Sequence, residues 1–303
     1  MKLFYHPIYS QLALPAHHRF PISKYQRLYD KVCANDELSA YLETCCAPPA
    51  SLEQINLVHE PIYVQQFLDG CLESKAQKRI GFPYSEELVK RTLQSVGNTI
   101  GAAKEALSSG FAINLGGGYH HAFADYGSGY CIFNDAAIAA RCLVNEQRVD
   151  KVLIVDLDVH QGDGSAAILA HDEDIITLSV HAEQNFPRLK QHSDYDFALQ
   201  KGCGDEHYLE TLAQALNLVI RLHTPDLIIY NAGADVVHED ELGVLSLTLE
   251  GVLARDKMVM NSALQHHIPL ACVLGGGYQR NVNGVIEAHW QLLRAAHQCY
   301  GEK

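Results

Sequence analysis

The sequence lacks the features that mark nucleic-acid-binding, membrane or secreted proteins. It contains 23 Lys and Arg against 36 Asp and Glu, a formal net charge of −13, whereas nucleic-acid binding usually needs a basic surface. No apolar run approaches the roughly 20 residues that span a bilayer, and the segment MKLFYHPIYSQ lacks the apolar stretch of a signal peptide. We therefore expect no nucleic-acid or membrane partner and a cytoplasmic location.

The chain also has no CxxC pair, no low-complexity tract and no segment that resembles an interdomain linker. Its nine cysteines are an odd number without regular spacing, which favours reduced thiols over a disulfide framework. With 303 residues, 48% of them hydrophobic, the chain can bury a large core. We therefore predict a single domain over residues 1–303.

Strand-like and helix-like segments alternate along most of the chain. Short apolar runs occur in FAINLGGG, KVLIVDLD, DIITLSVH, DLIIYNAGAD and LACVLGGGY, and helical stretches separate them. This alternation predicts an α/β fold in which helices cover both faces of a central parallel sheet. We also expect an edge strand at residues 3–5, helices from Ser23, over 59–72, 85–107 and 165–170, and a loop at 78–88.

The segment KVLIVDLDVHQGDGS, residues 151–165, carries the strongest chemical signal. Asp156, Asp158 and His160 follow its apolar run at every second position, so in an extended chain they point the same way. Carboxylates and an imidazole crowded together favour a bound cation. Together with Asp235, Asp158 and His160 supply a set of two carboxylates and one imidazole, which is typical of a catalytic metal with an open position. We predict zinc, although Fe²⁺, Co²⁺ or Mn²⁺ would suit the same ligands.

A capped strand end with a surface histidine is the simpler interpretation of Asp158 and His160 taken alone. Four predicted strands, however, end in polar or glycine-rich segments: residues 119–121, 156–160, 233–235 and 275–278. Parallel strands bring their carboxyl ends to one edge of the sheet, which is where ligands bind in open α/β sheets. The sequence therefore predicts an active site at that edge.

Further candidates for catalysis are a tandem histidine pair and a tyrosine. His120 and His121 follow three glycines, and Asp156 and Asp163 are available to orient them. If each histidine pairs with its own carboxylate, their pKa values separate, so that one acts as a base and the other as an electrostatic helper. Tyr278 follows another glycine triplet, where a phenol either packs under the sheet edge or donates to an oxyanion.

The order of these motifs resembles a known enzyme family. GGGYHHA, SGYCIFND, VDLDVHQGDG, NAGAD and LGGGY resemble the zinc-dependent histone deacetylases. HHRFPISKYQRL, IYNAGADVVHEDELGVLSLTLEGVLARD and LGGGYQRN are most similar to the class IV branch and its bacterial relatives. The resemblance runs from about Phe4 to Ala288 and implies an arginase/deacetylase-like fold. It also implies hydrolysis of the amide of an acylated lysine in a peptide or protein.

The resemblance assigns roles by motif position. It implies a zinc site formed by Asp158, His160 and Asp235. It implies catalytic roles for His120, oriented by Asp156, His121, oriented by Asp163, and Tyr278, which binds the substrate carbonyl. It implies a substrate tunnel with Tyr130, Phe186, Gly129 and Gly276, and an inner channel lined by Arg19. It also implies a structural potassium ion near Asp156, Asp158, His160, Ser179 and Val180.

Two departures from the family and several alternatives bear on these expectations. The segment AEQNF, between His181 and Pro187, is shorter than in many deacetylases, and no rim aspartate that would hold a peptide backbone can be identified. A binuclear arginase-type site would need an aspartate at the position of Gly162. A small-molecule deacylase acting on acetylated polyamines and a non-catalytic acyl-lysine reader stay open as alternatives. The class IV similarity also raises long-chain acyl groups as substrates, whereas the natural substrate and oligomeric state are not determined by the sequence.

Overall fold

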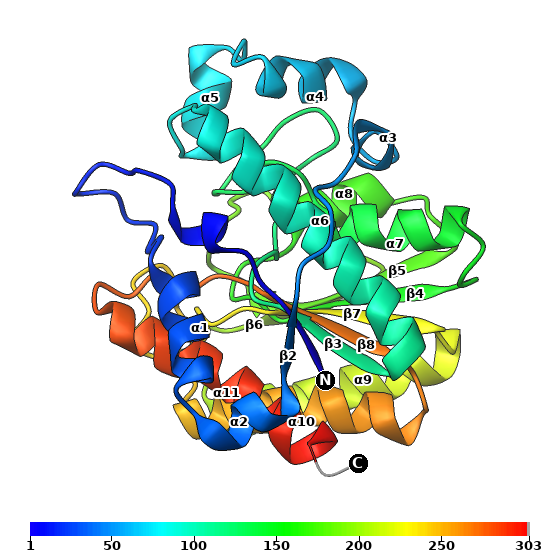
Figure 1. The fold of residues 1–303 in the computed structure, drawn as a ribbon. Helices are drawn as coiled ribbons and strands as arrows, with labels where there is room; N and C mark the ends of the chain where they lie inside the picture. The colour runs from blue at the N-terminus through cyan, green and yellow to red at the C-terminus, as the bar shows by residue number, and fades with distance from the viewer. Residues whose placement is uncertain (302–303) are drawn as a thin grey trace.

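A computed structural model describes residues 1–301, and its centre is one eight-stranded sheet (Figure 1). All neighbouring strands are parallel, in the order β2-β1-β3-β8-β7-β4-β5-β6. The strands are β1 Lys2–Phe4, β2 Glu43–Cys45, β3 Phe111–Asn114, β4 Val152–Asp156, β5 Ile175–Ala182, β6 Tyr195–Leu199, β7 Leu227–Ala232 and β8 Leu270–Leu274. This arrangement confirms the predicted α/β architecture with a central parallel sheet.

Helices lie on both sides of the sheet (Figure 1). One side carries α3 Leu52–Ile55, α4 Pro61–Leu68, α5 Ser74–Ile80, α6 Glu86–Ser109, α7 Asp135–Asn145 and α8 Asp163–Leu169. The other carries α9 Asp205–His223, α10 Leu249–Gln265 and α11 Val282–Tyr300, with α1 Lys24–Cys33 and α2 Asp36–Tyr41 packed on α11. Because both faces are covered, every residue of β3, β4, β5, β7 and β8 is buried.

The predicted helix ends agree best with the structure where a residue at the end of the helix caps it. Helix α6 begins after Ser85, whose side chain accepts a hydrogen bond from the Leu88 backbone N–H at 3.1 Å. It ends at Gly110, which adopts a φ of 87° that suits glycine. The helix expected over 59–72 is shorter, because α4 starts at Pro61, and proline favours the first turn of a helix.

Other predicted strands and helices differ in position from those in the structure. The strand expected at residues 3–5 is not an edge strand, since β1 lies between β2 and β3. Strands β2 and β6, which the sequence did not predict, form the two edges. The expected loop at 78–88 begins within α5, and α8 begins at Asp163 rather than at residue 165.

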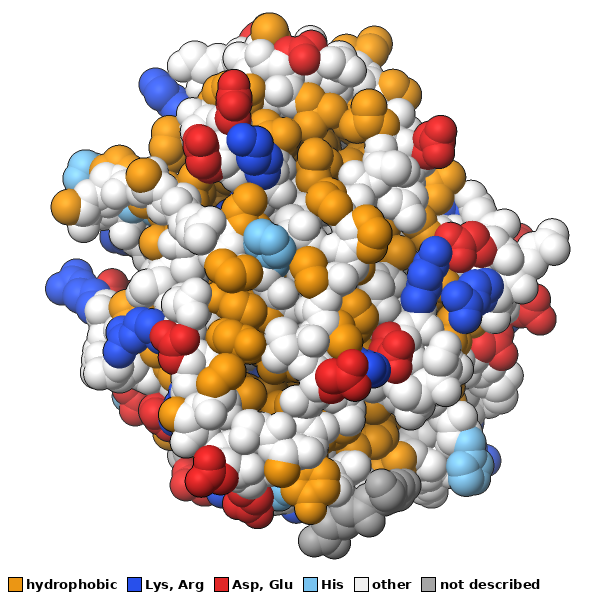
Figure 2. All heavy atoms as spheres, viewed as in Figure 1, with side chains coloured by type: hydrophobic (Ala, Val, Ile, Leu, Met, Phe, Trp, Pro, Cys, Tyr) orange, Lys and Arg blue, Asp and Glu red, His pale blue; other side chains and the backbone are white. Residues whose placement is uncertain are grey.

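Acidic and basic side chains are interspersed with apolar ones on the face that Figure 2 shows. Within residues 1–301, no helix combines the length and the apolar content needed to cross a bilayer.

Candidate metal centre and active site

The strands that end in chemically active segments are neighbours in the sheet. Strands β3, β8, β7 and β4 are adjacent in that order, and all run parallel. Their carboxyl ends therefore meet at one edge, as the sequence predicted. The segments that follow them carry His120 and His121 after β3, Tyr278 after β8, Asp235 after β7, and Asp158 and His160 after β4.

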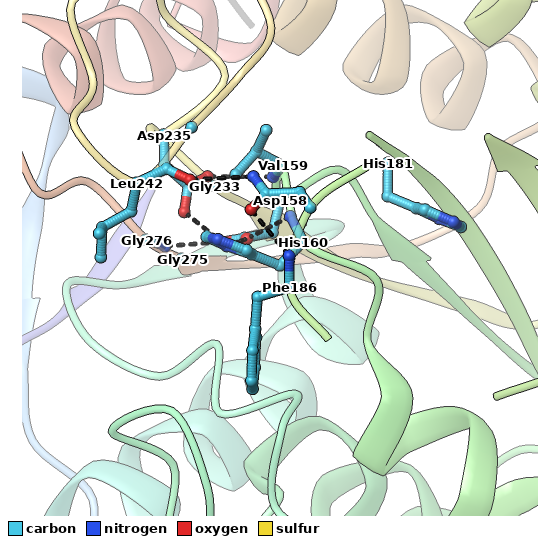
Figure 3. Close-up of polar contacts among 12 residues, drawn as sticks. Asp158, Val159, His160, His181, Phe186, Gly233, Asp235, Leu242, Gly275 and Gly276 are labelled. Atoms are coloured by element: carbon cyan, nitrogen blue, oxygen red, sulfur yellow. Dashed lines mark hydrogen bonds and ion pairs between the residues drawn. The ribbon is translucent and has the colours of Figure 1, made fainter. Parts of the chain in front are cut away.

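Asp158, His160 and Asp235 converge at this edge (Figure 3). One ligand atom from each lies within 4.8 Å of the others, and all three side chains are buried. His160 Nδ1 is 3.0 Å from Asp158 Oδ1 and 3.3 Å from Asp235 Oδ2. Within the described residues this is the one group of three such side chains close enough to hold a metal ion.

The environment of the three side chains favours a bound divalent cation over hydrogen bonds among the side chains alone. Asp235 Oδ2 is buried and accepts no hydrogen bond of good geometry, which is costly for a carboxylate. Burial lowers the pKa of His160, but hydrogen bonds and charges from Asp158 and Asp235 outweigh it and raise the pKa to about 10. A metal ion would satisfy both carboxylates in place of that proton. One nitrogen and two carboxylate ligands match the donor set of a catalytic zinc site.

Glycines allow the strand ends to approach this cluster. The Gly276 backbone N–H donates to Asp158 Oδ2 at 2.8 Å, and a Cβ at this position would overlap the Asp235 carboxylate. A Cβ at Gly162 would overlap the Asp156 carboxylate in the same way. No larger residue fits at Gly162 in this arrangement, which argues against the aspartate that a second arginase-type metal would need.

The tandem histidines have separate carboxylate partners, as expected. His120 Nδ1 lies 2.7 Å from Asp156 Oδ2, and His121 Nδ1 lies 2.5 Å from Asp163 Oδ1. Burial lowers the pKa of His120, but the charges of Asp156 and Asp158 raise it to about 9. Burial and the charge of His120 lower the pKa of His121 to about 4, although Asp163 opposes this shift. At neutral pH, His120 is therefore charged and His121 is neutral.

Tyr278 lies at the same edge, and its hydroxyl stays protonated. Burial, followed by the charges of Asp158 and Asp235, raises its pKa well above the ordinary value. Asp240 positions its backbone: Asp240 Oδ2 accepts from the Tyr278 N–H at 2.6 Å, and Oδ1 accepts from Leu242 and Gly243. Burial and the charge of Asp235 raise the pKa of Asp240 to about 6.

Sequence reasoning missed Asp240 and also missed Lys24. The Lys24 side chain is buried, and its Nζ donates to the carbonyl oxygens of Gly275 and Gly276, both at 3.2 Å. Burial lowers its pKa to about 8, although the charges of Asp235, Asp158 and Asp240 oppose the shift. A lysine in an amphipathic helix and an aspartate within HEDE both look like surface residues, so no local signal distinguished them.

A cavity of about 480 Å³ leads to the cluster. Its walls include Tyr130, Phe186, Gly129 and Gly276, all four predicted to contact substrate. The rings of Phe186 and His121 are 4.8 Å apart at 84°, and a Cβ at Gly129 would come within 2.8 Å of the His121 ring. Arg19 does not line this cavity and is exposed. Its predicted place in an inner channel is therefore corrected, since Lys24 occupies the inner wall.

With this geometry established, comparison with known proteins becomes informative. A family model described as the histone deacetylase domain matches residues 18–293. The chain belongs to the histone deacetylase family. It is accordingly a hydrolase of the deacetylase type, and the resemblance inferred from its motifs is confirmed at the level of the family.

Individual relatives of this histone deacetylase-family chain are similar over most of its length. An uncharacterized protein from Picosynechococcus sp. is 43% identical, with 98% of each chain covered. Histone deacetylase 2 from Arabidopsis thaliana is 30% identical over 89% of this chain and 72% of the relative. The acetoin utilization protein AcuC from Bacillus subtilis is 31% identical over 66% of this chain and 57% of the relative.

A solved structure supports the fold. The HD domain of HDA15 superposes with a TM-score of 0.81 at 18% identity, covering 97% of this chain and 90% of that domain. At this level of identity the likeness concerns the fold alone.

The residues expected to hold potassium in this family lie next to the metal cluster. Asp156 and Ser179 are register partners in β4 and β5, and Val180 follows in the buried part of β5. Asp158 and His160 belong to both predicted sets. His181, the next residue in β5, lies apart from the cluster of Asp158, His160 and Asp235 (Figure 3). The potassium site stays a prediction.

Proposed function

We propose that this protein is a zinc-dependent deacylase that removes an acyl group, acetyl or longer, from the side-chain amine of lysine. The observation that carries the proposal is the convergence of Asp158, His160 and Asp235 at the end of a cavity that also exposes two histidines of separated pKa. Zinc is the first choice of metal, with Fe²⁺ or Co²⁺ as substitutes for the same donors.

Zinc held by these three side chains would act as a Lewis acid toward the amide carbonyl and the attacking water. His121 is the proposed general base, because its neutral ring is oriented through Nδ1 by Asp163 and can accept the proton of the water at its other nitrogen. His120, charged and paired with Asp156, favours the negative charge that develops on the carbonyl oxygen. The Tyr278 hydroxyl donates a hydrogen bond to the same oxygen.

Collapse of the tetrahedral intermediate breaks the C–N bond. One of the two histidines then protonates the departing lysine amine, so that a carboxylate and free lysine are released. The aromatic walls formed by Tyr130 and Phe186 suit the methylene stem of lysine, because apolar surfaces favour methylenes and exclude water.

A small-molecule deacylase is the second candidate. The similarity to AcuC, a protein named for acetoin utilization, supports this alternative, although it covers only 57% of that relative. Turnover of acyl-lysine peptides measured beside that of acylated polyamines would separate the two candidates. A non-catalytic acyl-lysine binder is disfavoured, because every group that the proposed reaction needs is present.

The proposal is tested by metal analysis of the purified protein combined with activity on an acetyl-lysine peptide. We expect about one zinc per chain. His121→Ala and Tyr278→Phe should retain the metal but lose activity, and removal of an oxyanion donor such as the tyrosine hydroxyl typically costs ~10²–10³ in kcat. Wild-type turnover in both variants would refute the mechanism.

Two finer points belong to the same proposal. Placement in the class IV branch rests on the motifs in HHRFPISKYQRL and LGGGYQRN. That placement favours long-chain acyl groups, which comparison of acetyl-, octanoyl- and myristoyl-lysine peptides would test. Turnover that does not increase with chain length would rule out the long-chain preference.

A further inference from the structure

The charges that line the cavity contrast with those of the protein as a whole. The chain has a formal net charge of −13, yet the one carboxylate in the cavity wall is Asp158, a metal ligand at its inner end. Three cationic side chains line the wall: Lys24 is buried at the inner end, whereas Lys78 and Arg79 are exposed. The outer part of the cavity is therefore cationic in an acidic protein.

Backbone hydrogen bonds hold Lys78 and Arg79 against the entrance. They belong to the last turn of α5, which lies at the upper left in Figure 1. The Gly129 N–H donates to Arg79 O at 3.3 Å, and the Tyr130 N–H donates to Ile80 O at 2.8 Å. This end of α5 is thus tied to the loop that forms one wall of the entrance.

Neither cation is neutralised by a neighbouring carboxylate. Within the described residues, no ion pair shorter than 4 Å involves Lys78 or Arg79. The Arg79 guanidinium lies 4.5 Å above the Tyr126 ring, which restricts its position without removing its charge. Asp125, beside Tyr126, is an exposed acidic neighbour but does not line the cavity.

Lys190 stabilises the opposite wall, although it does not itself line the cavity. Lys190 Nζ donates to the carbonyl oxygens of Asn185 and Pro187, at 2.8 and 2.9 Å. Asn185 and Phe186 line the cavity on this side. A substrate whose acyl-lysine side chain enters the cavity therefore carries its main-chain and flanking groups past Lys78 and Arg79.

We propose that Lys78 and Arg79 select substrates that bear a carboxylate next to the acylated lysine. This inference rests on the proposed deacylase function and names its substrate class. The carboxylate belongs either to acidic residues that flank acyl-lysine in a peptide or to the free α-carboxylate of an acylated amino acid. Acylated polyamines and lysine-rich peptides would be repelled by the same cations, although the net charge of the whole protein attracts them.

The test compares acetyl-lysine peptides that differ only in the residues on either side of the acyl-lysine: Asp, Ser or Lys. For the wild type we expect kcat/KM to decrease in that order, with about a tenfold span from Asp to Lys, since exposed charge pairs have modest effects. The span should shrink in 1 M salt, where the Debye length falls to about 3 Å.

Charge reversal identifies the residues responsible. Lys78→Glu and Arg79→Glu should flatten or invert the order of kcat/KM across the three peptides, because each replaces a cation in the cavity wall by an anion. Arg148→Glu is the matched control, because Arg148 is exposed and precedes β4, at the opposite edge of the sheet. It makes the same change in net charge and should preserve the wild-type order.

A second pair of substrates separates the two sources of the carboxylate. If wild type turns over Nε-acetyl-lysine faster than its α-amide and Lys78→Glu does not, the carboxylate belongs to an amino-acid substrate. A preference confined to Asp-flanked peptides would assign it to acidic sequences. If the Ser-flanked peptide is turned over, but wild type, Lys78→Glu and Arg79→Glu all show the same preference for flanking residues, this inference is wrong and the proposed function is unaffected. Absence of any turnover of that peptide would overturn the proposed function and the inference with it.

Discussion

Asp240 is expected to support catalysis through the backbone of Tyr278. Its carboxylate accepts from the N–H groups of Tyr278, Leu242 and Gly243 at 2.6, 2.9 and 3.0 Å. Asp240→Ala removes all three hydrogen bonds at once, so the loop that carries the tyrosine loses its backbone attachment to the 235–243 segment and keeps only the Arg280–Glu241 ion pair of the contacts described. A hydrogen bond to a charged group typically contributes about 1.5–3 kcal/mol, which is enough to hold one loop conformation among several.

The expected kinetic effect follows from the role proposed for the tyrosine. A correctly placed oxyanion donor contributes ~10²–10³ to kcat, and a donor that spends part of its time displaced loses part of that factor. We therefore expect Asp240→Ala to lower kcat by roughly 10–100-fold and to change KM little. The thermal midpoint should also fall, since three partly buried N–H groups lose their partner.

A double-mutant cycle with Tyr278→Phe distinguishes positioning from general damage. If Asp240 acts through the Tyr278 hydroxyl, adding Asp240→Ala to Tyr278→Phe should lower kcat little further. Glu239→Ala is the control, because Glu239 is the exposed neighbour in sequence and should behave as wild type. This reasoning would be refuted if Asp240→Ala had the wild-type kcat. It would also be refuted if the fold-reduction in kcat of the double variant equalled the product of the two single reductions.

Three further predictions concern the metal and two pH dependences. Asp235→Asn should reduce the zinc content of the purified protein well below one per chain, as measured by elemental analysis, because it removes one of three ligands. The kcat/KM profile should fall at acid pH as His121, whose pKa is lowered by burial and by the charge of His120, is protonated, and at alkaline pH as His120, whose pKa is raised by Asp156, loses its proton. Asp156→Asn should move the alkaline limb to lower pH; an unchanged limb would contradict the assignment. Buried His59 has a pKa lowered to about 4 by burial, so the unfolded state binds more protons below about pH 6.5. Stability should therefore fall by up to about 3 kcal/mol between pH 6.5 and 4 in denaturant titrations, and this loss should be smaller in His59→Gln.

The hydrogen bonds of His59 also favour the neutral form of its ring. Its Nδ1–H donates to Phe123 O at 2.9 Å, and its Nε2 accepts from the Asn134 backbone N–H at 2.8 Å. A proton on Nε2 would face another donor, so the folded protein holds this ring neutral. Equal pH dependence in wild type and His59→Gln would show that another group accounts for the acid instability.

The sequence by itself determined the chemistry of the site, because the relevant signals are local. Asp156, Asp158 and His160 follow an apolar run at alternate positions, and that pattern alone predicts a strand whose end carries ligands. Ser85 and Gly110 likewise mark the ends of α6 through caps that involve only neighbouring residues. The alternation of strands and helices was sufficient for the fold class for the same reason.

Only the tertiary structure decided what depends on residues far apart in the chain. The order of β3, β8, β7 and β4 brings Asp235 within reach of His160, and no local pattern encodes which strands pair. Burial is equally non-local: Lys24 and Asp240 look like surface residues in sequence, but the loops that fold over them enclose their charges. The same holds for the cations at the cavity entrance, since hydrogen bonds from the Gly129–Tyr130 loop, far along the chain, tie the C-terminal end of α5 to the site.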